Sequence, residues 1–195
     1  PDPALIEKAA AIIASAERPL FVIGSGAYDA GESVAELAEL VQAAVTTRRM
    51  GHGVLPTQHP LMVPITSAHD LWPTADVVVG IGSRIEWPLG SWGYDDDLTL
   101  IQINVDETEL DRHGITDVGI HSDADLACRA LIDAIGPLNR PSRIPELNAL
   151  RASFQDRTSH LEPQLSYTAA IRDVLPDDGV MVEDVTQIGF AAHLF

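Results

Sequence analysis

The stretch "VVVGIGSR", residues 77–84, decides the fold of this chain. Residues 77–81 are apolar or glycine throughout, and such a run predicts a strand that is buried on both faces. Strands of this kind belong to parallel sheets that helices cover on both sides. Gly82 marks the place where the strand ends, and Arg84 puts a positive charge just beyond it. Working outward, we expect five further strands, at residues 20–23, 44–47, 61–64, 98–105 and 118–120.

Helical periodicity separates these predicted strands. Apolar side chains recur every three to four residues, which predicts helices at residues 4–16, 32–42, 66–75 and 123–135. This alternation of strand and helix predicts the α/β class. We therefore expect a doubly wound, Rossmann-like domain over residues 1–137, with six parallel strands in the order 3-2-1-4-5-6.

The sequence changes character after residue 137. Four prolines fall close together, at positions 137, 141, 145 and 163, and proline interrupts regular structure. We expect a linker over residues 138–163 that contains a polar helix at 146–160. Residues 164–195 are then expected to begin a second α/β domain, with a helix at 166–175, a strand at 179–183 and a helix that starts near Gln187. One strand and two helices cannot close a domain, so we expect this second domain to be truncated and the chain to be a piece of a longer protein.

Composition and charge exclude several classes of function. The chain has 195 residues, 46% of them hydrophobic, which is enough to bury a core and unlike a disordered chain. Its 29 acidic and 12 basic residues give a formal net charge of −17, which opposes binding to nucleic acid or to an anionic membrane. No apolar run approaches the roughly 20 residues that span a bilayer. The single cysteine, Cys128, cannot form an internal disulfide, which favours a cytoplasmic location.

Two glycine-containing turns at strand ends are the first candidates for a binding site. Gly24-Ser25-Gly26 follows the strand at 20–23, and Gly82-Ser83-Arg84 follows the strand at 77–81. In doubly wound sheets, ligands bind beyond the carboxyl ends of the strands, at the switch in strand order. The two turns face each other there if their strands are neighbours.

Each of these turns has a plainer interpretation. Gly24 and Gly26 would let a nucleotide or diphosphate approach the backbone, but the dinucleotide fingerprint is incomplete, so a tight turn between strand and helix is the alternative. Arg84 suits a phosphate or a carboxylate, and its alternative is a salt bridge to Glu86 or Asp76.

Asp106 follows the strand at 98–105 and is a third candidate. Its carboxylate could accept hydrogen bonds from ribose hydroxyls, or it could cap a short helix at 107–110. The histidines at positions 52, 59 and 69 match no zinc spacing. The sequence contains no nucleophile elbow, no phosphate loop and no evident pair of histidine and carboxylate. We therefore expect no metal site and no catalytic residue in this chain.

Several runs of sequence together resemble a known family. Residues 4–61, "ALIEKAAAIIASAERPLFVIGSGAYDAGESVAELAELVQAAVTTRRMGHGVLPTQHPL", are similar to the middle domain of thiamine-diphosphate-dependent enzymes of the acetohydroxyacid synthase, benzoylformate decarboxylase and pyruvate oxidase group. The runs "ADVVVGIGSRI" (75–85), "LIQINVDETEL" (100–110) and "HSDADLACRALIDAI" (121–135) extend this resemblance. The run "YTAAIRDVLPDDGVMVEDVTQIGF" (167–190) is similar to the start of the third domain, which binds the cofactor's diphosphate.

The resemblance implies an activity for the complete enzyme. Such enzymes are lyases or carboligases that act on a 2-oxo acid with thiamine diphosphate and Mg²⁺, and they are homodimers or homotetramers. Their cofactor is held by a glutamate in the first domain and a Gly-Asp-Gly…Asn motif in the third, and this sequence contains neither part. We therefore expect the chain alone to be inactive, to bind no thiamine diphosphate, and to be a monomer or a weak dimer.

The resemblance also implies which residues would contact a nucleotide. The middle domain of some members holds FAD or ADP, and by position such a ligand would contact Gly24, Ser25, Gly26, Thr47, Met50, Gly51, Arg84 and Asp106. Ile85-Glu86-Trp87-Pro88 replaces the Phe-Asp-Asp-Arg run of the synthases that keep FAD, which counts against FAD. Near the carboxyl end, Thr186 and Gln187 would approach the diphosphate of the cofactor, unless Thr186 or Asp184 only caps the helix that follows.

Two other functions stay open on the residues alone. One is an NAD-dependent oxidoreductase domain, against which the incomplete glycine fingerprint counts. The other is a non-catalytic nucleotide-binding or assembly module.

Overall fold

The fold is built around a parallel sheet. The computed structural model describes residues 1–176 and 178–193, and its strands are β1 (Leu20–Ile23), β2 (Ala44–Thr47), β3 (Val77–Ile81), β4 (Thr99–Asn104) and β5 (Val118–His121). They pair in the order β2-β1-β3-β4-β5, all parallel. Every residue of β1, β2 and β3 is buried. The α/β class and the parallel sheet are therefore confirmed, and β1, β2 and β3 have the bounds that the sequence predicts.

The prediction of six strands is wrong, because five form among the residues that the structure describes. Residues 61–64 lie beside β2, where the predicted order puts them, but they make only one bridge, between Met62 and Val45. The amide of Val45 donates to the carbonyl of Leu61, and the amide of Val63 donates to the carbonyl of Val45, both at 2.8 Å. A turn precedes this bridge, and a helix begins at Ile65 directly after it. The pairing of residues 61–64 with β2 therefore stops at this one bridge.

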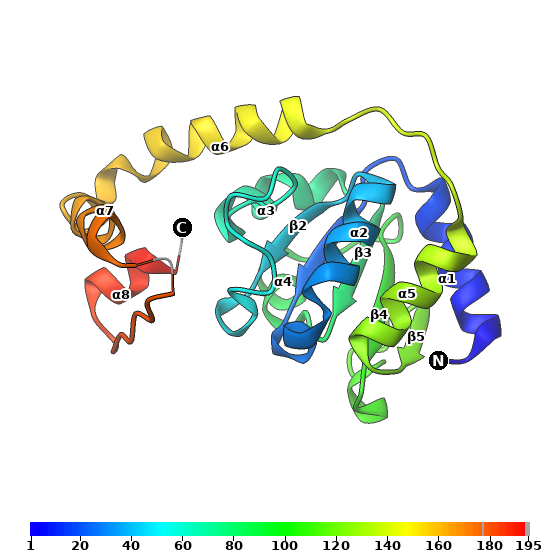
Figure 1. Cartoon of the computed structure of the whole chain (residues 1–195). Coiled ribbons are helices and arrows are strands. Elements are labelled where there is room, and N and C mark those ends of the chain that lie inside the picture. Colours follow the sequence, from blue (N-terminus) through cyan, green and yellow to red (C-terminus); the bar gives the residue numbers. More distant parts are fainter. Residues whose placement is uncertain (177, 194–195) are drawn as a thin grey trace.

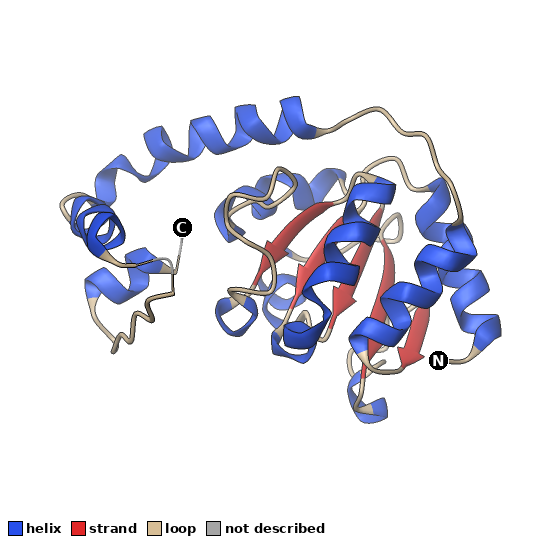
Figure 2. Cartoon of the chain, in the orientation of Figure 1, coloured by secondary structure: helices blue, strands red, loops and turns tan. Residues whose placement is uncertain are grey.

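Helices cover both faces of the sheet (Figures 1 and 2). Helices α1 (Pro3–Ser15), α2 (Gly31–Val41) and α5 (Ala124–Ile135) pack together on one face. Helices α3 (Ile65–Leu71) and α4 (Glu86–Trp92) lie against the other. The sequence pattern does not predict α4, because Pro88 and Gly90 disfavour a helix. None of the helices in the described part of the chain is long and apolar enough to span a membrane.

Three helices follow the sheet domain: α6 (Ile144–Thr158), α7 (Gln164–Val174) and α8 (Gln187–Ala192). All three lie within two residues of their predicted starts. The predicted strand at 179–183 is wrong, because this segment pairs with no strand among residues 1–176 and 178–193. Its side chains face solvent instead, with Val180 81% and Val182 90% exposed. An apolar run forms a strand only when a neighbour supplies hydrogen-bond partners.

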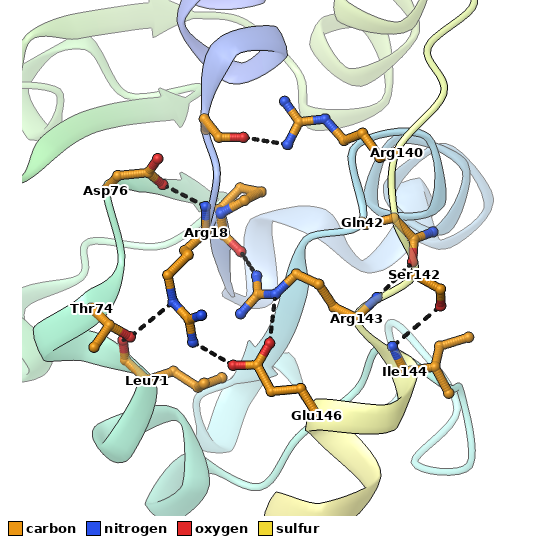
Figure 3. Close-up of polar contacts among 12 residues, drawn as sticks. Arg18, Gln42, Leu71, Thr74, Asp76, Arg140, Ser142, Arg143, Ile144 and Glu146 are labelled. Carbon is orange, nitrogen blue, oxygen red and sulfur yellow. Dashed lines mark hydrogen bonds and ion pairs between the residues drawn. The ribbon is translucent and has the colours of Figure 1, made fainter.

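Arginine side chains tie the segment at 138–158 to the sheet domain (Figure 3). Arg140 donates to the carbonyl oxygens of Ile13, Ala14 and Ala16 at the end of α1, where helix geometry leaves carbonyls short of intrahelical donors. Further along, Arg143 donates to the carbonyl oxygen of Pro19 at 3.0 Å. The start of the predicted linker is thus hydrogen-bonded to the domain.

Glu146 joins two arginines of this contact. It accepts from Arg143 Nε at 3.1 Å and pairs with Arg18. Burial opposes the charge of this carboxylate, but the hydrogen bonds and charges of Arg143 and Arg18 outweigh burial and lower the pKa of Glu146. Beyond it, Arg151 Nε donates to the carbonyl oxygen of Met62 at 3.0 Å, and Arg157 pairs with Asp70.

Gln102 in β4 offers a test of the core. Its side chain is fully buried, and neither polar atom has a hydrogen-bond partner among the described residues. Its neighbours across the sheet are Gly80 and Gly119, which supply no side chain. An unpartnered buried polar group costs roughly 1–3 kcal/mol. We therefore expect Gln102→Met, of similar shape, to raise the melting temperature by about 2–4 °C.

Thermal unfolding followed by circular dichroism checks this expectation. Gln102→Ala is the control, since it removes the same polar atoms but leaves a cavity that costs stability. A lower melting temperature for Gln102→Met would show that the amide has a partner that matters.

Candidate functional site

The carboxyl ends of β1, β3 and β4 open onto a groove of about 820 Å³. The sheet runs from β1 to β2 in one direction and from β1 to β3 in the other, so this is the switch in strand order. Six of the predicted nucleotide contacts line the groove: Gly24, Ser25, Gly26, Met50, Arg84 and Asp106. The expectation that the turns after residues 23 and 81 face each other is confirmed, because β1 and β3 are paired.

The glycines bring these two turns into backbone contact. The amide of Gly26 donates to the carbonyl oxygen of Gly82 at 3.1 Å. A Cβ atom on Gly24 would lie 2.2 Å from that same oxygen, and one on Gly26 would lie 2.8 Å from the Cα of Gly82. Glycine at these positions therefore lets the two turns approach each other, and whether a nucleotide also approaches them stays a prediction. Gly51 is packed similarly beneath the groove, since its Cβ would lie 2.4 Å from the carbonyl oxygen of Ile23.

Arg84 pairs with a residue that the sequence analysis missed. Its Nη2 lies 3.4 Å from Glu109 Oε1, and Arg112 Nη1 lies 3.1 Å from the same oxygen. The predicted partners, Glu86 and Asp76, are therefore wrong, and Asp76 accepts instead from the amide of Arg18 at 2.9 Å. The Arg84 side chain stays 60% exposed. Its guanidinium has five N–H donors, so a single long contact with Glu109 leaves donors for a ligand anion.

Asp106 caps the short helix at Glu107–Glu109, as one of its two interpretations predicts. Its Oδ1 accepts from the amide of Thr108 at 3.0 Å and from the Thr108 hydroxyl at 2.6 Å. These hydrogen bonds are the main cause that lowers the pKa of Asp106. The carboxylate therefore stays ionised and fixed at the rim of the groove. The ribose contact stays a prediction.

The remaining predicted residues lie outside the groove. Thr47 ends β2 and lines neighbouring cavities instead. The hydroxyl of Thr186 accepts from the amide of Gly189 at 3.0 Å and caps α8. The side-chain amides of Gln187 and Gln164 lie 2.6 Å apart. Whether Thr186 and Gln187 approach a diphosphate stays a prediction.

A second cavity of about 400 Å³ lies beside the groove, beyond the end of β2. We call it the arginine pocket, because its lining includes Arg48, Arg49 and Arg157, together with Thr47, His52, Ile65, Thr66, His69, Asp70, Trp87, Trp92, Phe190 and His193. Arg48 and Trp87 line both cavities and so form the wall between them. Ligands bind beyond the carboxyl ends of parallel strands, and this rule pointed to Gly24 after β1. The same rule applies to Arg48 after β2, so this arginine could have been predicted from the sequence.

His52 is half-buried at this pocket. The centroid of its ring lies 6.3 Å from that of His193 on α8. Burial lowers the pKa of His52, and His193 lowers it further. Among the described residues, no three histidine, cysteine or acidic side chains lie together as a metal site.

Comparison with known proteins gives a consistent result. The family described as "Thiamine pyrophosphate enzyme, central domain" matches residues 6–131. Glyoxylate carboligase of Escherichia coli O157:H7 is 32% identical over 163 residues, which are 78% of this chain and 28% of that protein. Oxalyl-CoA decarboxylase of Escherichia coli K12 is 28% identical over 180 residues, 90% of this chain and 27% of the relative.

A third relative is matched over a similar extent. Acetolactate synthase isozyme 1 large subunit of Escherichia coli K12 is 30% identical over 193 residues, which are 93% of this chain and 34% of that subunit. The chain thus spans between 27% and 34% of the length of these relatives.

The contact between the two glycine turns can be tested by substitution. Gly24→Ala would place a methyl group against the Gly82 carbonyl and force the turns apart, so we expect a loss of at least about 2 kcal/mol in the free energy of unfolding. Gly90→Ala is the matched control, because a Cβ there meets no atom within 4 Å. In the helix α4 it should be neutral or gain up to about 1 kcal/mol. Urea unfolding measures both, and equal stability of the two variants would refute the contact.

The lowered pKa of His52 predicts a pH dependence of stability. The unfolded chain binds a proton at this histidine near pH 6.5, whereas the folded chain binds it only at lower pH. Stability from this group is therefore complete above about pH 6.5 and is lost as the pH falls below it. We expect His52→Gln to flatten the fall in melting temperature between about pH 7.5 and 5.5. An exposed-site control is His113→Gln, and identical slopes for the two variants would contradict the prediction.

Proposed function

The chain belongs to the thiamine pyrophosphate enzyme family through its central domain, and on that basis we propose that it forms part of a lyase or carboligase acting on a 2-oxo acid. The family match over residues 6–131 carries this proposal. The names of the relatives support it, since they include a carboligase, a decarboxylase and an acetolactate synthase. Thiamine diphosphate supplies the carbanion chemistry of such enzymes when it is bound.

The described residues do not fit thiamine diphosphate and Mg²⁺. No cluster of three metal-binding side chains exists in residues 1–176 and 178–193. Glu183 is engaged by His193, with 2.7 Å between Oε1 and Nε2, and the Thr186 hydroxyl caps α8. We derive no catalytic step from these residues. In this proposal residues 1–137 are the central domain, 138–163 the linker and 164–195 the beginning of the diphosphate-binding domain, and residues outside this chain hold the cofactor.

The groove at the strand switch is proposed to bind ADP. Arg84 offers free donors to a phosphate, and Asp106, which lines the same groove, offers carboxylate oxygens to ribose hydroxyls. Arg48 stacks on Trp87 within the groove wall, its Cζ 4.5 Å from the ring centroid. This Trp87 stands where the FAD-keeping synthases have an acidic residue, so we favour ADP over FAD. A non-catalytic nucleotide-binding module is the second candidate, and the same groove supports it.

The proposal also covers the location of the protein in the cell and its assembly with further copies. Cys128 is fully buried, and burial is the main cause that raises its pKa to about 12. A buried, neutral thiol that forms no disulfide suits the reducing cytoplasm, and we propose that location for the protein. We propose that the complete enzyme is a homodimer or homotetramer, and that this chain alone is a monomer or a weak dimer because its charge of −17 opposes self-association.

Thermal shift with ADP tests the groove. At one hundred times its dissociation constant, ADP should stabilise the chain by about 2.7 kcal/mol, which raises the melting temperature by about 5–10 °C. Arg84→Gln removes a charged donor to phosphate and should raise the dissociation constant about tenfold. Arg129→Gln is the control, because Arg129 pairs with Asp125 on α5 and does not line the groove.

The same thermal-shift measurement is made with FAD, with NAD, with CoA, and with thiamine diphosphate plus Mg²⁺. A shift with NAD alone would favour the oxidoreductase alternative, and no shift with any nucleotide would leave a structural domain. Calorimetric titration should detect no thiamine diphosphate binding. A micromolar dissociation constant there would show that this chain holds the cofactor itself.

A further inference from the structure

The arginine pocket carries a positive charge that the described structure does not neutralise. Its lining contains three arginines and one carboxylate, Asp70, and that carboxylate pairs with Arg157. Arg48 and Arg49 pair with no carboxylate among the described residues. Burial lowers the pKa of Arg48, and the adjacent charge of Arg49 lowers it further. Two neighbouring cations in a chain of net charge −17 mark a place where an anion would relieve repulsion.

Both guanidinium groups lie over aromatic rings. Arg48 Cζ lies 4.5 Å from the centroid of Trp87, and Arg49 Cζ lies 5.8 Å from that of Phe190. Each guanidinium has five N–H donors, so contact with a ring leaves donors for an anion. Trp92 meets Trp87 edge to face at 5.2 Å between centroids. The pocket therefore combines free cationic donors with aromatic walls.

Thr66 provides an observation independent of the charges. Its hydroxyl oxygen is buried and makes no hydrogen bond with any residue that the structure describes, and Thr66 lines the pocket. Buried hydroxyl groups are normally hydrogen-bonded, and of the unpartnered side chains among the described residues Thr66 is the one that lines this pocket, so an anion in the pocket would supply the missing partner. A hydroxyl can donate to an anion as the arginines do.

We propose that the arginine pocket binds a phosphomonoester that carries a planar aromatic group. Arg48, Arg49 and Thr66 contact the phosphate, and Trp87 and Trp92 contact the ring. This goes beyond the proposed function, because the ADP groove lies on the other side of the wall formed by Arg48 and Trp87. An experiment can therefore refute binding at one of the two sites without refuting binding at the other.

Three simple probes separate the parts of this recognition. Phenyl phosphate carries both charge and ring, inorganic phosphate carries only the charge, and phenol carries only the ring. Titrations at pH 8 on the 195-residue chain, by calorimetry and by tryptophan fluorescence, give the affinities. We expect phenyl phosphate to bind saturably and about tenfold more tightly than inorganic phosphate, since aromatic contacts add to the charge.

Substitutions test whether phenyl phosphate binds in the arginine pocket. Arg49→Gln should weaken phenyl phosphate about tenfold, because Arg49 lines the pocket and not the groove. Thr66→Val should weaken it about threefold or more. Ser67→Ala is its matched control, because Ser67 also has a buried, unpartnered hydroxyl but does not line the pocket. Arg84→Gln, in the groove, should change nothing.

The proposal is overturned by any of three results. These are the absence of saturable phenyl phosphate binding, phosphate binding as tight as phenyl phosphate, and affinity that falls in Arg84→Gln but not in Arg49→Gln. Thr66→Val keeps the test decisive if an arginine variant fails to fold, since it removes an unpartnered atom and keeps the shape. Loss of ADP binding with phenyl phosphate binding intact would count against the proposed groove alone.

Discussion

The backbone contact between the turns that leave β1 and β3 is the constraint on which the groove depends. Each turn continues the hydrogen bonding of the sheet one residue past its strand: the amide of Gly24 donates to Ile81 at 3.0 Å, and that of Gly82 donates to Ile103 at 2.9 Å. The chain then turns away with Gly82 at a φ of +57°, a conformation that glycine adopts without strain. Because neither turn carries a Cβ at the crossing, Arg84 leaves the sheet at the rim of the groove.

The sequence predicts β1, β2 and β3 to the residue. β1 and β3 are apolar or glycine throughout and β2 is Ala-Val-Thr-Thr, and all three are buried along their length, so local pattern and tertiary environment agree. The segments at 61–64 and 179–183 are also apolar, but a strand needs a partner along its length. The first lies between a turn and a helix, and the second has no neighbouring strand among the described residues. The pattern of apolar residues shows that a segment prefers to be buried, but it does not show whether a neighbouring strand is present to pair with it.

The candidate site also has features that the local sequence predicts and features that depend on tertiary packing. The strand-end rule brings Gly24, Arg84 and Asp106 to one groove, since parallel strands end at one edge of a sheet. It cannot give the partner of Arg84, because Glu109 arrives through a helical turn whose position depends on packing. Nor can it separate the groove from the arginine pocket, since the wall between them is a contact of Arg48 with Trp87, 39 positions apart in the sequence.

The arginine contacts of the segment at 138–158 have a consequence for the order of folding. Arg143 reaches the carbonyl of Pro19 across 124 residues, and Glu146 reaches Arg18 across 128. The contact of Arg143 with the Pro19 carbonyl requires α1 and β1 to be in place, and both contacts join parts of the chain that are far apart in sequence. Contacts of such high sequence separation carry a large loop-closure cost, so we expect them to form late in folding. Interactions that are absent from the transition state slow unfolding and leave the folding rate unchanged, and we therefore expect these contacts to slow the unfolding of the domain without changing how fast it folds.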